Sequence, residues 1–185
     1  SSWPEIDARL KTTRTVVVPI GSNEQHGPTG LLGTDWMCPE IIAHEAQKNA
    51  DILIGPTFNI GMAQHHLGFP GTISLRPSTF IAAIGDWVRS LAGHGFEKIL
   101  FLNGHGGNAE LMQLAVRDIV LEHPVRAAAG SYWNIAWDAL IAADAHRGRR
   151  LPGHAGDFES SLMLALRPEL VAADRPHRAP SGDTD

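Results

Sequence analysis

Apolar runs of strand length alternate along the chain with longer stretches whose apolar residues recur at helical spacing. The runs at 15–20 ("TVVVPI"), 52–56 ("ILIGP") and 98–103 ("KILFLN") are almost entirely apolar, as expected of strands buried on both faces. A fourth run at 125–130 ("VRAAAG") is a candidate for another strand. This alternation predicts an α/β fold, a single domain with a mostly parallel β-sheet sandwiched between α-helices.

Four stretches between and after these runs predict helices. They cover 39–49, with Pro39 in the first turn; 79–95, with Ser78 as the N-cap; 108–122; and 157–166. In the third stretch, helical spacing predicts that the following residues face inward: Leu111, Leu114, Ala115, Ile119 and Val120.

The end of the chain differs from the rest in composition. From about residue 167 it is rich in Pro, Arg and Asp and has no apolar face. We therefore expect one domain over 1–168, followed over 169–185 by a tail or by an incomplete end of the domain. A length of 185 residues suits a single core.

Charge and cysteine content exclude several classes of partner. The formal net charge is −5 and the basic residues are scattered, so the chain lacks the basic stripe that nucleic acids require. The single cysteine, Cys38, cannot form an intramolecular disulfide. With neither a signal-like segment nor an apolar run of membrane-spanning length, we expect a cytoplasmic protein without a membrane partner.

Polar side chains follow two of the predicted strands at the point where each ends. "SNEQHGP" (22–28) comes after the first strand, and "NGHGGN" (103–108) follows the strand at 98–103. Because the carboxyl ends of parallel strands lie at one edge of a sheet, the two loops should meet there. In an extended segment Glu24 and His26 project to the same side, whereas Gln25 points the other way and supports the loop.

These loops carry the side chains of a possible metal site. Asp35 lies nine positions after His26, and His105 sits among glycines that permit close approach of the backbone. Carboxylates and imidazoles suit zinc, manganese or ferrous iron, and a carboxylate bridging two ions would help to activate a water. Two alternatives stay open: Glu24 and His26 form a solvated loop pair, or "NGHGGN" cradles an anion in a metal-free binding module.

Two further side chains are candidates for contact with a small molecule. His66, before the "FPGT" turn, either borders a substrate pocket, as its neighbour His65 does less clearly, or caps the turn. Trp133 forms either an apolar wall over a planar substrate, together with Trp137, or part of the core, since their i, i+4 spacing is that of a helix.

Four motifs occur in an order and at spacings that resemble the creatininase (creatinine amidohydrolase) family. They are "PIGSNEQHGP…GTD", "FPGTISL", "NGHGGN" and "HAGDFESS", and the similarity runs from Trp3 to about Pro168. The resemblance implies a parallel α/β sandwich and a binuclear centre that hydrolyses a non-peptide amide bond, of a cyclic amide or a formamide, through a metal-activated water. It implies two divalent ions per subunit, zinc first, then manganese or iron, and a homo-oligomer, commonly a hexamer.

The resemblance also implies roles for individual residues. Glu24 and His105 would hold one ion, Asp35 would bridge, and His26 would hold the second. His154 matches a family histidine that moves protons or binds substrate, and an ordinary imidazole pKa near neutrality suits proton transfer. Glu159 would be a metal ligand or the base, and so has a place among both the ligands and the catalytic residues.

Two departures from creatininase itself bear on the substrate. There the histidine of the glycine-rich loop is followed by Tyr-Glu, whose Glu is a metal ligand, and here those positions are Gly106 and Gly107. Glu159 is the best replacement for that ligand. The loop at 29–31 also lacks the His and Leu-Pro found in much of the family. Since the family includes deformylases and a peptidase that trims a redox-peptide precursor, peptide trimming is the alternative activity.

Overall fold

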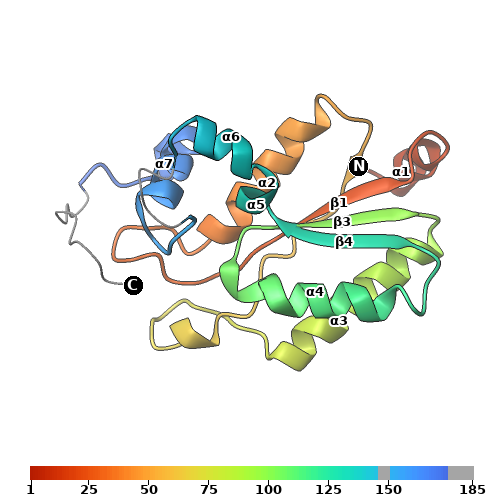
Figure 1. The fold of residues 1–185 in the computed structure, drawn as a ribbon, viewed down its shortest axis with the longest axis horizontal. Coiled ribbons are helices and arrows are strands. Elements are labelled where there is room, and N and C mark those ends of the chain that lie inside the picture. Colours follow the sequence, from red (N-terminus) through yellow and green to blue (C-terminus); the bar gives the residue numbers. More distant parts are fainter. Residues whose placement is uncertain (146–150, 175–185) are drawn as a thin grey trace.

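The fold was described from a computed structural model, which covers residues 1–145 and 151–174. Helices and strands alternate along the chain as far as β4, and helical segments follow it in the described residues (Figure 1). In chain order they are α1 (Trp3–Leu10), β1 (Thr15–Ile20), α2 (Thr34–Gln47), β2 (Leu53–Ile54), η1 (Gln64–His66), α3 (Pro77–Gly93), β3 (Lys98–Asn103), η2 (Gly106–Asn108), α4 (Ala109–Ile119), β4 (Arg126–Ser131), α5 (Tyr132–Ile135), α6 (Trp137–Ala142), α7 (Asp157–Leu166) and η3 (Pro168–Leu170).

The strands form one parallel sheet in the order β2-β1-β3-β4. β1 pairs with β3 in register from Thr15↔Lys98 to Ile20↔Asn103, so the two strands end side by side. β1 and β3 have the bounds predicted from the sequence, and β4 begins one residue later than predicted. β2 is confined to Leu53–Ile54, much shorter than its apolar run.

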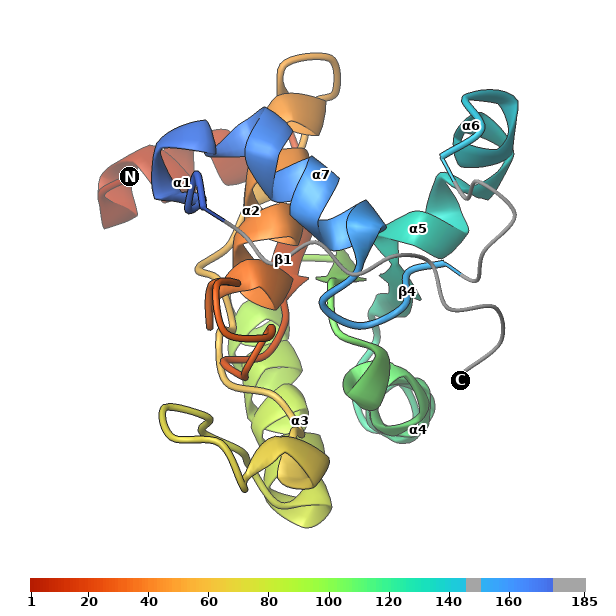
Figure 2. The same cartoon turned by 90° about the vertical axis from the view of Figure 1, so that its left-hand side faces the viewer.

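Helices cover both faces of the sheet, which gives three layers. Figure 1 places α3 and α4 on one face and α2 on the other, and Figure 2 shows the same division with α7 lying over α2. Alternate β1 residues serve the two cores: Val16 and Val18 pack on the α3/α4 side, and Val17 packs on the α2/α7 side. The α/β sandwich expected from the sequence is therefore confirmed.

Three details of the helices differ from expectation. Ser78 is not the N-cap of α3, because this helix begins at Pro77 and Arg76 is its N-cap residue. α2 begins at Thr34, five residues before Pro39, so Pro39 lies inside the helix and not in its first turn as predicted. In α4, the buried positions are Met112, Ala115, Val116 and Ile119, whereas Leu114 is 56% exposed. Leu114 was thus wrongly assigned to the inner face.

The end of the described chain continues to contact the domain. Val171 packs against the α2/α7 core, five residues after α7 ends. Residues 175–185 of the predicted tail lie outside the described part, and the division at 168 stays a prediction. Among residues 1–145 and 151–174, no helix is both long and apolar enough to span a membrane.

Candidate metal centre

The ends of β1 and β3 bring the two polar loops together, as expected of loops that follow the carboxyl ends of parallel strands. Ile20 and Asn103 are paired, and the amide of Gly104 donates a hydrogen bond of 2.8 Å to the carbonyl of Ile20. The chain then diverges into the 22–28 loop on one side and the glycine-rich loop on the other. Glu24 and His105 consequently face each other across adjacent strands, with 3.3 Å between Oε2 and Nε2.

The first turn of α2 lies directly on these strand ends. A Cβ added to Gly21 would lie 2.3 Å from the carbonyl oxygen of Asp35, and one added to Gly104 would lie 2.1 Å from the same atom. Pro39, four residues on, has no N–H to donate to that carbonyl as a helix normally would. Close approach at glycine therefore sets Asp35 at the sheet edge.

The Asp35 carboxylate lies between two histidines. Oδ1 accepts a hydrogen bond of 2.9 Å from Nε2 of His26, and Oδ2 lies 2.9 Å from Nδ1 of His105. All three side chains are buried. Each carboxylate oxygen thus faces a different imidazole, which is the arrangement a carboxylate would need to bridge two ions.

Two more carboxylates complete the cluster. Glu24 is fully buried; its Oε2 accepts a hydrogen bond from the Ser22 hydroxyl. Glu159, in the first turn of α7, accepts a hydrogen bond of 2.6 Å from the amide of Ala155 and lies 3.6 Å from Nε2 of His26. Glu159 therefore reaches the cluster beside His26, and its role as metal ligand or base stays a prediction.

Crowding of the carboxylates shifts their protonation in the metal-free protein. Burial raises the pKa of Glu24 to about 7 and that of Glu159 to about 7, and the charge on Asp35 adds to both shifts. Burial acts in the same direction on Asp35, but its contacts with His105 and His26 outweigh it and lower the pKa of Asp35 to about 2. In the metal-free protein, the cluster therefore favours an ionised Asp35 with Glu24 and Glu159 partly protonated over three ionised carboxylates.

The two inner histidines respond to the same charge. Burial disfavours a cationic His26, yet the hydrogen bond that His26 donates to Asp35 raises the pKa of His26 to about 9. Burial likewise opposes a charge on His105, and Asp35 again raises the pKa above the ordinary value. In the metal-free protein, the positive charge of protonated His26 therefore compensates the negative charge of Asp35. A divalent ion bound here would supply that positive charge instead.

His66 and His154 lie at the mouth of the cluster, stacked with ring centroids 4.3 Å apart. Gln25 contacts both: its Nε2 lies 3.0 Å from Nδ1 of His66 and 2.8 Å from Nε2 of His154. The expectation that Gln25 points away from the site is therefore wrong. Residues 24–26 are not in a strand, so side-chain alternation does not apply to them.

His154 also differs from expectation in its acidity. Burial, together with His26 and His66, lowers the pKa of His154 to about 4. The side chain is therefore neutral at pH 7, and the near-neutral pKa that suggested it as a proton carrier is absent in the metal-free protein. His154 still reaches the cluster, with Nδ1 3.6 Å from Oε1 of Glu24.

Two asparagines that the sequence analysis did not single out hold the glycine-rich loop. Asn103 accepts a hydrogen bond from the His105 amide and donates to the His105 carbonyl. Asn108 is fully buried; its Nδ2 donates to the carbonyl of Gly21 and its Oδ1 accepts from the amide of Met62. The Met62 carbonyl in turn contacts Nε2 of His105 at 3.0 Å. The sequence signal was the asparagine at each end of "NGHGGN".

We expect Asn108→Ala to lower the free energy of unfolding by about 2 kcal/mol, because it leaves buried polar groups of Gly21 and Met62 without partners. Urea denaturation measures the change. Asn49→Ala, at an exposed asparagine, is the matched control and should change stability by less than about 0.5 kcal/mol. Equal stability of the two variants would contradict the bracing role of Asn108.

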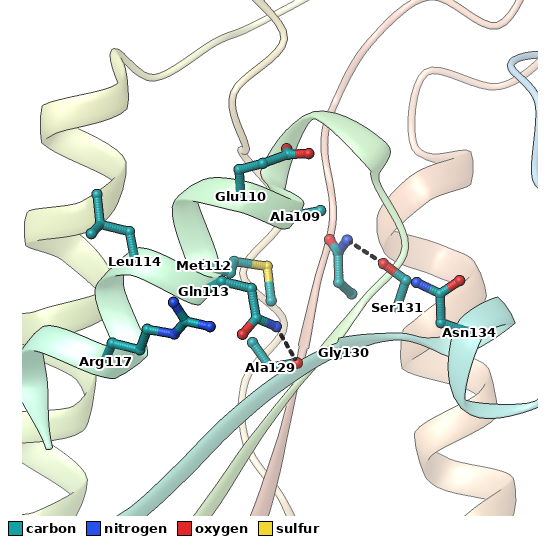
Figure 3. Close-up of a pocket in the computed structure, with 11 residues that line it drawn as sticks. Ala109, Glu110, Met112, Gln113, Leu114, Arg117, Ala129, Gly130, Ser131 and Asn134 are labelled. Carbon is teal, nitrogen blue, oxygen red and sulfur yellow. Dashed lines mark hydrogen bonds between the residues drawn. The ribbon is translucent and has the colours of Figure 1, made fainter.

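A cavity of about 430 Å³ lies away from the cluster, between α4, β4 and α5. Figure 3 shows it lined by Gln113, which donates to the Ala129 carbonyl, and by Ser131, which Asn103 contacts. It contains none of the predicted site residues. Trp133 lies elsewhere, 5% exposed in the α2/α7 core, which favours the core alternative left open for it and leaves little of its surface for a substrate.

The donor atoms present fit divalent metal ions. Oε1 of Glu24 and Oδ2 of Asp35 are buried, and neither accepts a hydrogen bond of normal geometry from the described residues, although Oδ2 lies 2.9 Å from Nδ1 of His105. Several sets of three side chains place one donor atom each within 4.8 Å of one another, and one of these sets consists of Glu24, His26 and Asp35, all three buried. Buried carboxylate oxygens beside imidazole nitrogens are the ligand atoms that a zinc or manganese site offers.

Comparisons with known proteins agree on one family. The family profile described as creatininase, creatinine amidohydrolase, matches residues 1–185. Creatinine amidohydrolase of Pseudomonas putida is 31% identical over 94% of this chain and 73% of its own length. The mycofactocin precursor peptide peptidase of Mycolicibacterium smegmatis is 33% identical over 86% of this chain and 60% of its own length.

The fold comparison gives the same answer. A solved structure described as creatininase Mn matches with a TM-score of 0.88 and 28% sequence identity, over 100% of this chain and 78% of that chain. The motif order, the buried carboxylate and histidine cluster, and the full-length family match point to the same conclusion. The chain belongs to the creatininase family of metal-dependent amidohydrolases.

Proposed function

We propose that this protein hydrolyses a non-peptide C–N bond, of a cyclic amide or a formamide, at a centre that holds two divalent metal ions. The observation that carries the proposal is the Asp35 carboxylate, each of whose oxygens lies 2.9 Å from a different buried imidazole. A single structural hydrogen bond would need only one of these oxygens. Two ions sharing Asp35 would use both.

The ligands on either side of Asp35 follow from the same geometry. Nδ1 of His105 lies beside Oδ2 of Asp35, and Nε2 of His26 lies beside Oδ1. Glu24 lies 3.3 Å from Nε2 of His105, and Glu159 lies 3.6 Å from Nε2 of His26, so we propose Glu24 with His105 for one ion and Glu159 with His26 for the other. Glu159 would replace the glutamate that the glycine-rich loop lacks. Its carboxylate lies 3.6 Å from Nε2 of His26 and comes from α7 instead of from that loop. When bound, such ions lower the pKa of a water toward neutrality and polarise an amide carbonyl.

The residues at the mouth act on the substrate rather than on the ions. His66 is 14% exposed at its side chain and His154 is 36% exposed, so both can reach a molecule that enters from solvent. Because His154 is neutral at pH 7, we propose that it acts on the substrate through its ring N–H. Glu159 keeps both of the roles proposed for it, ligand and base.

A substrate screen tests the proposal. Protein stripped by a chelator and reloaded with zinc, manganese or ferrous iron is assayed against cyclic amides, formamides and short peptides. We expect hydrolysis of one of the first two classes only in reloaded samples. Equal turnover in stripped and reloaded samples would contradict the metal-dependent mechanism.

Metal affinity should rise with pH through neutrality. Because burial holds the pKa of Glu24 and of Glu159 near 7, both carry protons below pH 7 that a metal must displace. The metal-free form is therefore favoured at low pH, and affinity at pH 6 should be about tenfold weaker per carboxylate than at pH 8. Calorimetry in buffers of different ionisation enthalpy measures the released protons. A pH-independent affinity would contradict these two ligands.

Peptide trimming is the second candidate activity. The loop after η1 presents Leu67, Phe69 and Ile73, each more than half exposed, in the segment that directly follows His66. An apolar rim of this kind suits a substrate that extends beyond a small ring. Cleavage of peptides alone in the screen would favour this candidate.

The assembly is also part of the proposal. By analogy with the family we expect a homo-oligomer, with six subunits as the leading possibility. Light scattering coupled to size exclusion gives the subunit number directly. A monomer at micromolar concentration would contradict this expectation.

A further inference from the structure

The side-chain amide of Gln25 has an orientation that its own contacts determine. Its Oε1 lies 2.8 Å from the backbone amide of Gly27, which can only donate. The oxygen and nitrogen of this amide therefore cannot be exchanged without placing two donors together. Nε2, with its two hydrogens, necessarily faces the rings of His66 and His154.

Both hydrogens of that nitrogen have an acceptor. One is directed at Nδ1 of His66, 3.0 Å away, and the other at Nε2 of His154, 2.8 Å away. A ring nitrogen that accepts a hydrogen bond carries a lone pair, and in a neutral imidazole the proton is then on the other nitrogen. Gln25 therefore places the proton on Nε2 of His66 and on Nδ1 of His154.

The two protonated nitrogens converge on one atom. Nε2 of His66 lies 3.5 Å from Oε1 of Glu24, and Nδ1 of His154 lies 3.6 Å from the same oxygen. The rings are stacked with 20° between their planes, so the two N–H groups point into the site side by side. They form a pair of donors directed toward a buried oxygen that has no hydrogen-bond partner among the described residues.

This arrangement decides between two uses of the same atoms. Glu24, His66 and His154 place one donor atom each within 4.8 Å of one another, so their geometry alone would allow a further metal ion. A metal-binding imidazole nitrogen must give up its proton to the other nitrogen, which usually donates to an acceptor. Here Gln25 offers a donor instead, which opposes metal binding at both rings.

We infer that Gln25 is a positioning residue that fixes the tautomers of His66 and His154 and makes them a pair of N–H donors for an acceptor oxygen of the substrate. The tautomers follow from geometry alone, and only the use of the donors rests on the proposed hydrolase. A carbonyl or carboxylate oxygen is the class of group that two converging N–H donors recognise.

The test is nitrogen NMR of the metal-free protein labelled at histidine, which reports the protonated nitrogen of each ring. We expect Nε2–H at His66 and Nδ1–H at His154. In Gln25→Glu, whose carboxylate accepts where the amide donated, both tautomers should reverse. Gln113→Glu, at a glutamine outside the cluster, should leave both unchanged. A His154 proton on Nε2 in the unaltered protein, or tautomers unaffected by Gln25→Glu, would overturn the inference.

Metal titration and kinetics distinguish control of the tautomers by Gln25 from a purely structural role of this residue. The Gln25→Glu variant should bind one more Zn²⁺ per chain than the unaltered protein, because Nε2 of His66 and Nδ1 of His154 become free to bind it. The Gln25→Met variant, which cannot hydrogen-bond, should keep the metal content and lose kcat/KM by about tenfold or more. Binding of Zn²⁺ through these rings in the unaltered protein would overturn the inference. Since the tautomers are read without metal or substrate, failure of the proposed hydrolase would be recognised separately.

Discussion

Asp35→Asn should weaken metal binding by at least about 100-fold and remove metal-dependent hydrolysis, the largest effect expected of any single substitution in the cluster. An asparagine keeps the shape of the side chain but offers one acceptor and one donor where Asp35 has two acceptors. One of His26 and His105 would then face an amide nitrogen at about 2.9 Å. Equilibrium dialysis with Zn²⁺ or Mn²⁺ measures the change.

The control for this substitution is Asp51→Asn, which alters an exposed ion pair with Arg9. It should leave the metal content unchanged, because Asp51 lies outside the cluster. Circular dichroism would establish that Asp35→Asn still folds. Folded Asp35→Asn protein that retains two ions and full turnover would remove Asp35 from the centre.

Gly104→Ala should strongly destabilise the protein, although it adds only a single methyl group. The new Cβ would lie 2.1 Å from the carbonyl oxygen of Asp35 and 2.6 Å from Cδ of Pro39, and neither atom can rotate away. The first turn of α2 would have to move off the strand ends. We expect a loss of about 3 kcal/mol in the free energy of unfolding, measured in urea, together with weaker metal binding.

The same loop provides a matched control. A Cβ at Gly106 meets no atom within 4 Å, so Gly106→Ala changes composition without a clash. Its stability should differ from that of the unaltered protein by less than about 1 kcal/mol. If Gly104→Ala is as stable as Gly106→Ala, the close contact between α2 and the strand ends does not determine the position of Asp35.

The strand pattern was sufficient to predict the sheet and one edge of it as the site. β1 and β3 are nearly uniform apolar runs with polar residues directly after them, so their bounds and the meeting of Glu24 with His105 followed from parallel pairing alone. The strand at 52–56 was predicted too long, because its later residues hydrogen-bond only singly to β1.

Side-chain directions outside regular structure could not be predicted in this way. Gln25 lies in a loop that turns back at Gly27, and the resulting hydrogen bond carries its amide toward His66 and His154. Leu114 was misplaced because helical spacing fixes which residues share a face but not which face meets the sheet, and here Met112 and Val116 do. In both cases the local sequence pattern allowed more than one side-chain direction, and contacts with distant parts of the chain decided between them.

The pKa values of the side chains in the cluster could not be predicted from the sequence either. An ordinary pKa suggested His154 as a proton carrier, whereas burial and its neighbours His26 and His66 lower that pKa to about 4. Glu24 and Glu159 shift in the opposite direction because they share a buried site with Asp35. Such shifts depend on which side chains meet in space and how far they are buried.

We propose that Glu24, His26, Asp35, His105 and Glu159 together hold two divalent ions. Elemental analysis tests this ligand set on chelator-stripped protein that has been reloaded with Zn²⁺ or Mn²⁺ and freed of excess metal. We expect two equivalents per chain, and less than one in Asp35→Asn. Metal-free protein after reloading, or two equivalents retained without the Asp35 carboxylate, would contradict it.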